Sequence, residues 1–217
     1  VIVLEPDALL IASMSMDSAS CNGVADGTAT ANGITGGNGI NSFSWNTTPV
    51  QTTNPAIGLA AGNYTVTVTD QKGCFTTRDT SVLEPLLLVI DTAFQDSVSC
   101  NGLFDGSASV AVSGGNGIYS YLWSDGQTTA TASNLTAGTY NVTITDQKGC
   151  FKDTSVTVLE PDALSVDTSF QDSVSCNGLF DGSASILGAG GNGIYTYLWS
   201  DGQTTSTASN LTAGTYN

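Results

Sequence analysis

Five cysteines are the residues of this chain best suited to covalent chemistry. They occur in two local settings: Cys21, Cys100 and Cys176 each begin C-N-G, whereas Cys74 and Cys150 each end K-G-C. Metal ligation would need C-x-x-C spacing or a nearby histidine, and the sequence has neither. We favour disulfides over free buried thiols, because small modules bury little core and gain from a covalent bond.

Carboxylates in turns offer a second chemistry, the binding of calcium. Asp105 lies in FDGS, Asp146 in TDQKG, and Glu160 and Asp162 in LEPDAL. Hard cations take oxygen ligands of this kind. Asp-Gly patterns are also ordinary turn sequences, and no EF-hand spacing occurs. Turn formation is therefore the favoured interpretation, calcium is the alternative, and no other cofactor is expected.

Catalysis is disfavoured by the composition. The sequence has no histidine, which excludes Ser-His and Cys-His nucleophiles. A glycosidase with paired carboxylates would have to be repeated almost unchanged along the chain. Three GGNG segments, at 36–39, 114–117 and 190–193, lack the Gly-Lys-Ser/Thr of a phosphate-binding loop and are predicted to be tight loops with positive φ. We predict that the protein is not an enzyme.

The same motifs recur in the same order along the chain. FQDSVSCNGLFDGSAS occurs at 94–109 and again at 170–185, and a looser copy, DSASCNGVADGTAT, lies at 17–30. Such self-similarity predicts tandem modules. The predicted division is 1–6 for the end of a preceding module, 7–85 for repeat 1, 86–161 for repeat 2 and 162–217 for an incomplete repeat 3. Both ends fall inside a repeat, so we expect an internal piece of a longer protein.

Each repeat is predicted to consist almost entirely of β-strands. SASVAV (107–112), YNVTIT (140–145) and TSVTVL (154–159) alternate small polar residues with β-branched or apolar ones, and no segment has a helical period. With turn signals at short intervals, about seven strands per repeat indicate a two-layer sandwich. The predicted fold class is all-β, with tandem immunoglobulin- or fibronectin-like β-sandwich modules in a linear array.

Two features of each repeat favour the immunoglobulin type of core. A tryptophan is expected on the third strand, and L-x-A-G-x-Y before the sixth strand is typical of a tyrosine corner. Tyr119 and Tyr121 share the parity of Trp123, so we interpret them as facing the core rather than as an exposed strip for stacking sugars. The predicted core residues are Trp45, Trp123, Trp199, Tyr64, Tyr140 and Tyr216.

The motif order resembles the SprB-type repeat of Bacteroidota cell-surface and gliding-motility adhesins. The resemblance rests on CNG..DGSAS, SGGNGIYSYLWSDGQTT, NLTAGTYNVTITDQKGC and VTVLEP, and it extends over the whole of 1–217. It implies a protein exported by the type 9 secretion system and held at, or released from, the outer cell surface. We expect a structural stalk or fibre-forming repeat region of a long secreted adhesin or filament. The alternative is a polysaccharide- or ligand-binding module of a secreted multidomain protein.

The connectivity of the disulfides is less constrained than their existence. We favour pairing within each repeat, Cys21 with Cys74 and Cys100 with Cys150, which leaves Cys176 to a partner beyond the fragment. In a simple immunoglobulin topology the end of the first strand and the start of the last strand lie at opposite ends of the sandwich. Pairing within a repeat therefore requires a modified first strand.

Charge narrows the range of partners. The chain has 19 acidic and 4 basic residues, a formal net charge of -15, which would repel nucleic acid and anionic membrane surfaces. No apolar run reaches the ~18 residues of a membrane-spanning helix. The expected partners are neighbouring repeats, other copies in a fibre, and a cell-surface or polysaccharide ligand. The resemblance also implies O-glycosylation where Asp-Ser or Asp-Thr precedes a small or apolar residue, at Ser18, Thr92, Ser97 and Ser173.

Overall fold

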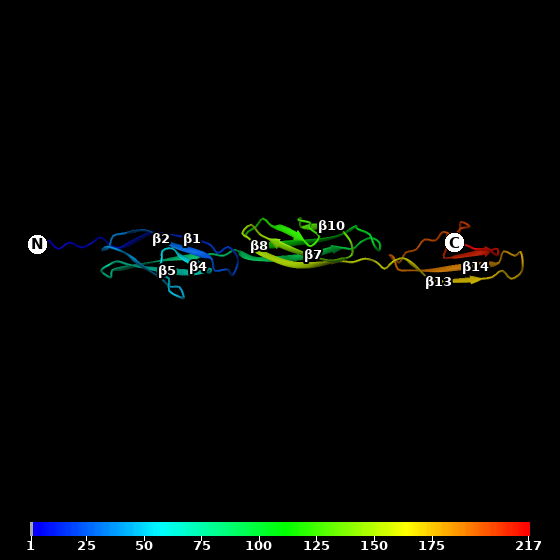
Figure 1. Cartoon of the computed structure of the whole chain (residues 1–217), viewed down its shortest axis with the longest axis horizontal. Coiled ribbons are helices and arrows are strands. Elements are labelled where there is room, and N and C mark those ends of the chain that lie inside the picture. The colour runs from blue at the N-terminus through cyan, green and yellow to red at the C-terminus, as the bar shows by residue number, and fades with distance from the viewer. Residues whose placement is uncertain (1) are drawn as a thin grey trace. The chain divides into compact units, whose positions relative to one another are not determined.

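The computed structural model of the chain describes residues 2–217 and consists of strands and loops (Figure 1). Val1, the first residue of the segment 1–6 assigned to a preceding module, lies outside the described residues. Residues 2–217 form fifteen strands and no helix, which confirms the all-β class. None of these residues therefore belongs to a helix long and apolar enough to cross a membrane.

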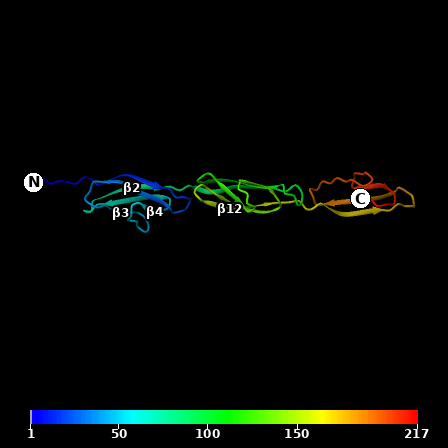
Figure 2. The same ribbon diagram turned by 45° about the horizontal axis from the view of Figure 1, so that its top comes forward.

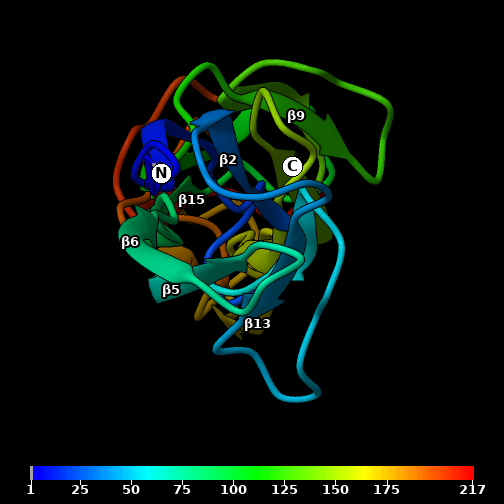
Figure 3. The same cartoon turned by 90° about the vertical axis from the view of Figure 1, so that its left-hand side faces the viewer.

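The first repeat is a sandwich of two antiparallel sheets with three strands each (Figure 2). One sheet has the order β1-β2-β4 and the other β3-β5-β6, and β5 and β6 lie side by side in Figure 3. An immunoglobulin-like sandwich of seven strands, A to G, has this strand order when its fourth strand, D, is missing. The bounds are β1 Leu10–Asp17, β2 Gly27–Thr35, β3 Ser42–Trp45, β4 Ala56–Leu59, β5 Gly62–Thr69 and β6 Phe75–Val82.

The second repeat reuses this plan with two sheets, and the third repeat contains the counterpart of the first sheet alone. Their sheets have the orders β10-β8-β7, β12-β11-β9 and β13-β14-β15. The chain is thus a tandem array of immunoglobulin-like sandwiches. The bounds are β7 Leu86–Asp96, β8 Gly106–Gly115, β9 Ser120–Trp123, β10 Thr131–Leu135, β11 Gly138–Thr145, β12 Phe151–Val158, β13 Ser165–Asp172, β14 Gly182–Ala189 and β15 Thr207–Leu211.

Two details of the strand prediction are wrong. Each of the first two repeats has six strands rather than about seven, because the chain between β3 and β4 is a loop at 46–55 and the chain between β9 and β10 is a short turn at 124–130. The loop contains two prolines, which cannot donate to a strand ladder. In the third repeat the segment before Trp199 is not a strand. In the second repeat the corresponding strand, β9, pairs with residues 142–145. Asn217 corresponds in sequence to Asn141, so residues 162–217 contain no counterpart of 142–145 with which such a strand could pair.

Contacts divide the chain into two compact units that do not follow the sequence repeats. The first comprises residues up to Thr92 with 111–129 and 142–154, and the second comprises 93–110, 130–141 and 155–217. The strands of the three repeats lie at 10–82, 86–158 and 165–211, inside the boundaries expected from the sequence. Neighbouring repeats therefore share contacts within each compact unit.

A tryptophan lies in the core of every repeat. The exposed fraction is 1% for Trp45, 1% for Trp123 and 6% for Trp199. In the first repeat the indole belongs to a buried cluster with Val66 and Val68 of β5. Each indole N–H donates to a backbone carbonyl at 2.8–2.9 Å, so burial leaves no donor unsatisfied.

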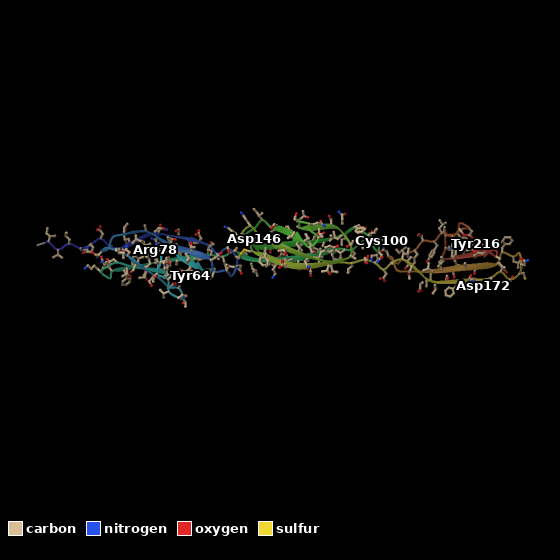
Figure 4. All side chains as sticks on the ribbon, in the orientation of Figure 1. Tyr64, Arg78, Cys100, Asp146, Asp172 and Tyr216 are labelled. Atoms are coloured by element: carbon tan, nitrogen blue, oxygen red, sulfur yellow. A yellow bond between two sulfur atoms is a disulfide. The ribbon has the colours of Figure 1, made fainter. Side chains whose placement is uncertain are left out.

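Each repeat also contains a tyrosine corner. The hydroxyl of Tyr64 donates to the carbonyl of Ala60 at 2.9 Å, and those of Tyr140 and Tyr216 donate to the carbonyls four residues upstream at 3.1 and 3.2 Å. All three rings are half-buried, and Tyr64, which is labelled with Tyr216 in Figure 4, packs on the core of the first repeat. In the first two repeats the corner fixes the chain where β5 and β11 begin, at the glycine of L-x-A-G.

Candidate functional site at the links between repeats

Buried aspartates anchor the hairpins that carry K-G-C. The side chain of Asp146, between β11 and β12, is only 5% exposed (Figure 4). Its carboxylate accepts the backbone N–H of Asn116 at 2.8 Å and the side-chain N–H of the same residue at 2.9 Å. It also accepts the backbone N–H groups of Lys148 at 2.8 Å and Cys150 at 3.0 Å. In the first repeat Asp70 makes the same bonds at 2.8–3.1 Å, with Asn38, Lys72 and Cys74.

This hydrogen bonding keeps the two carboxylates ionised. Burial alone would raise the pKa of Asp146, but the N–H donors of Asn116, Lys148 and Cys150 outweigh it and hold the pKa below its ordinary value. The pKa of Asp70 is lowered in the same way against the effect of burial. Each carboxylate thus ties a GGNG loop to a TDQKGC hairpin, which accounts for both motifs.

The GGNG loops have the positive φ angles expected from the sequence. Gly36, Gly114 and Gly190 have φ of 75°, 76° and 70°. A Cβ on any of them would collide with the backbone carbonyl of Ala8, Leu87 or Ala163 respectively, just before or at the start of the first strand of each repeat. At these positions only glycine lets the two backbones approach so closely.

The C-N-G segment of the first repeat holds the link at 83–85 that leads into the second repeat. The backbone N–H of Gly23 donates to the carboxylate of Glu84 at 2.6 Å. The side-chain amide of Asn22 donates to the carbonyl of Pro85 at 3.1 Å. Two consecutive residues after the cysteine therefore fix the two residues that join the repeats.

The link at 159–161 between the second and third repeats is held by the same contacts. Gly102 donates its backbone N–H to the carboxylate of Glu160 at 2.9 Å, and Asn101 donates its side-chain amide to the carbonyl of Pro161 at 3.1 Å. The recurrence shows that C-N-G and L-E-P act as a matched pair.

Three of the four carboxylates proposed for calcium, those of Asp105, Asp146 and Glu160, accept hydrogen bonds from the protein. Asp105 accepts the backbone N–H of Ser99 at 2.9 Å and its hydroxyl, which lower the pKa of Asp105, the hydroxyl more than the N–H. Glu160 and Asp146 are bonded as described above, and the backbone carbonyl of Asp162 accepts an N–H from the third GGNG loop at 2.8 Å. Within residues 2–217 no three or more Cys, Asp or Glu side chains gather so as to hold a metal ion.

A disulfide joins the first repeat to the second. Cys21 is bonded to Cys150, with a Cα–Cα distance of 5.7 Å and a sequence separation of 129. Beside the bond, the side-chain amide of Asn116 donates to the carbonyl of Ser20 at 2.9 Å. The GGNG loop and the hairpin of the second repeat therefore both engage the C-N-G end of the first.

The predicted pairing of Cys21 with Cys74, and of Cys100 with Cys150, is wrong. Gly37 of the first GGNG loop donates to the carbonyl of Asp7, just before β1, and Asp70 holds that loop against the hairpin of Cys74. Cys21 follows the far end of β1. The eight residues of β1 span about 26 Å, whereas bonded cysteines have Cα atoms within about 7 Å. The first strand is not modified, so the cysteines of one repeat stay apart.

The remaining predicted residues are exposed or half-buried. Cys74, Cys100 and Cys176 are free and exposed thiols. Tyr119 and Tyr121 are half-buried, so they do not form an open aromatic strip, and burial raises the pKa of Tyr121. The predicted glycosylation positions are all exposed and remain predictions: Ser18, Thr92, Ser97 and Ser173.

Sequence reasoning missed Asn116, and it assigned Asp146 to a turn or to calcium rather than to the bond between the GGNG loop and the hairpin. Asn116 and Asp146 lie in GGNG and TDQKGC, which were interpreted as separate turns. The signal was available, because Asn38 and Asp70 repeat the pair in the first repeat. What the sequence did not indicate was that one carboxylate joins both turns.

Strand order, core tryptophan and tyrosine corner together define a tandem array of immunoglobulin-like sandwiches. The family model of the SprB repeat matches residues 92–128 and 168–204. The chain therefore contains SprB repeats at these two places, as the order of motifs indicated. Both matched segments begin in the first strand of a repeat and end shortly after its core tryptophan.

Other comparisons add little to this assignment. No curated protein matches the chain. Among solved structures, the chain is similar to the N-terminal eight Ig domains of Down syndrome cell adhesion molecule isoform 1.30.30, with 13% sequence identity and a TM-score of 0.34. The similarity covers 88% of this chain and 30% of that one. So low a score does not establish a common fold, which rests here on the strand order.

Proposed function

We propose that the chain is a structural stalk or fibre-forming repeat region of a long secreted cell-surface adhesin or filament. The observation that carries the proposal is the repetition of one set of link contacts. Gly23 with Glu84 and Gly102 with Glu160 make the same bond at successive links. A chain that holds a distant domain in place needs links that do not bend freely, and these contacts restrain the link backbone.

The covalent bond across the first link supports the same proposal. Cys21 and Cys150 belong to different repeats, so their disulfide resists separation of the repeats as well as unfolding. Disulfides persist in oxidising compartments, which favours an extracellular location and agrees with export by the type 9 system. The net charge of -15 favours solubility and discourages non-specific association.

The site chemistry favours a structural role over ligand binding or catalysis. The two tyrosines considered for stacking on sugars, Tyr119 and Tyr121, are half-buried, and the hydroxyl of Tyr119 donates to the carbonyl of Gly114 at 2.7 Å. The sequence contains no histidine to act as a general base. The asparagine of C-N-G and the glutamate of L-E-P, by contrast, make their bonds at both links.

Energy transfer between two fluorophores tests the stiffness of the first link. The chain supplies the attachment points, because Cys74 and Cys100 are exposed thiols in successive repeats and Cys176→Ser removes the third. A stalk predicts a single narrow distribution of transfer efficiency in single-molecule measurements. The matched control inserts a Gly-Gly-Ser-Gly-Gly linker after Pro85, which should broaden the distribution. A natural chain as broad as this control would refute the stalk.

A further inference from the structure

We propose that the first cysteine of each repeat is the partner of the hairpin cysteine in the repeat that follows. Cys21 and Cys150 are one instance of the rule. By this rule, Cys100 forms a disulfide with the hairpin cysteine of a third repeat that includes a TDQKGC hairpin like the one in the second repeat. By the same rule Cys74 and Cys176 have no partner among residues 2–217, which agrees with their being free and exposed.

The surroundings of Cys100 already match those of Cys21. The side-chain amide of Asn192 in the third GGNG loop donates to the carbonyl of Ser99 at 3.0 Å. This bond is the counterpart of the one from Asn116 to Ser20 at 2.9 Å. In each case the asparagine reaches the residue that precedes the first cysteine. The third GGNG loop therefore lies beside Cys100. It is the counterpart of the loop that holds the hairpin in the second repeat.

Each of the two cysteines lines a cavity that the GGNG loop of the following repeat also lines. Beside Cys21 the cavity is about 320 Å³ and is lined by the hairpin residues Gly149 and Cys150. Beside Cys100 it is about 670 Å³ and is lined by Asn192 and Tyr195 among others. The cavity beside Cys100 is thus lined by both the first cysteine and the GGNG loop. A hairpin docked on that loop, as in the second repeat, would bring its cysteine to Cys100.

The bond forms by exchange with an oxidant that is itself a disulfide. One cysteine thiolate attacks the oxidant and forms a mixed disulfide, and the second thiolate displaces the reduced oxidant. Two thiols lose two protons and two electrons, and the oxidant becomes two thiols. Oxidised glutathione provides this chemistry in a refolding buffer.

The test continues the third repeat with a copy of residues 142–161 placed after Asn217. The extended chain is refolded in oxidised and reduced glutathione, its free thiols are alkylated, and its disulfide-linked peptides are mapped by mass spectrometry without reduction. The proposal predicts two bonds, Cys21 to Cys150 and Cys100 to the added copy of Cys150. Alkylation of Cys100 should fall from nearly complete in the 217-residue chain to nearly absent.

A matched chain with serine in place of the added cysteine should restore full alkylation of Cys100, which separates pairing from shielding by the added strands. A bond between the added cysteine and Cys176, the pairing within one repeat, would overturn the proposal. So would a reactive Cys100 in an extended chain whose Cys21 and Cys150 are bonded. The second outcome also demonstrates that the first two repeats folded.

Discussion

Breaking the bond between Cys21 and Cys150 should destabilise the chain by an amount that follows from the size of the loop. Cross-linking removes loop-closure entropy from the unfolded chain in proportion to the logarithm of loop length. For a separation of 129 residues the loop-closure relation gives about 5 kcal/mol at 25 °C. At a slope of about 2 kcal/mol per M, the urea midpoint should fall by roughly 2.5 M.

Urea unfolding of the double variant Cys21→Ser with Cys150→Ser, followed by tryptophan fluorescence, measures this loss. Each single variant removes the same bond, so either alone should lose as much as the double variant, and the effects should not add. Cys74→Ser is the matched control, because that thiol is free and exposed. Equal midpoints for the double variant and the oxidised natural chain would refute the bond, and a large loss in Cys74→Ser would favour pairing within the repeat.

Three further outcomes are expected from urea unfolding of single variants. Tyr64→Phe removes the corner hydrogen bond and should cost about 1 kcal/mol; no change would show that the corner is dispensable. Gly114→Ala should cost more than Gly117→Ala, because both have positive φ but only at Gly114 would a Cβ meet backbone; equal losses would contradict the close approach. Asp146→Asn should be less stable than the natural chain at neutral pH. Because the folded pKa of Asp146 lies below the unfolded value of about 4, its stabilisation is present above that pH and is lost as the pH falls through the folded value. The difference between the two proteins should therefore shrink in acid, and a constant difference would contradict the lowered pKa.

Local sequence was sufficient to predict the fold class because the decisive signals lie within a few residues of one another. Alternation in YNVTIT predicts one buried face, and Val142 and Ile144 on that face are buried. L-x-A-G-x-Y places Tyr140 within reach of the carbonyl four residues upstream. Turn signals alone do not fix the number of strands, which is six rather than about seven in each of the first two repeats.

The cysteine pairing was harder to predict because it depends on contacts between repeats. Identical cysteines in every repeat allow pairing within a repeat or between neighbours, and sequence similarity does not distinguish the two. The structure distinguishes them, because the full length of β1 lies between Cys21 and the hairpin that carries Cys74. The sequence held one indication against pairing within a repeat, which is that a simple immunoglobulin topology places the two cysteines at opposite ends of the sandwich. Because β1 is an unmodified strand, this argument was correct.

The bond between Cys21 and Cys150 also changes what a protease can do to the chain. Residues 22–149 lie within a ring that is closed through sulfur, so one cut of the peptide backbone in that stretch opens the ring and leaves both pieces attached. A cut in the segment 151–175, outside the ring, divides the chain at once. After a first cut within the ring, the part of the chain that follows Cys150 would stay attached to the part that precedes Cys21 through the disulfide. The two parts would separate only after a reductant breaks the disulfide or a second cut falls outside the ring.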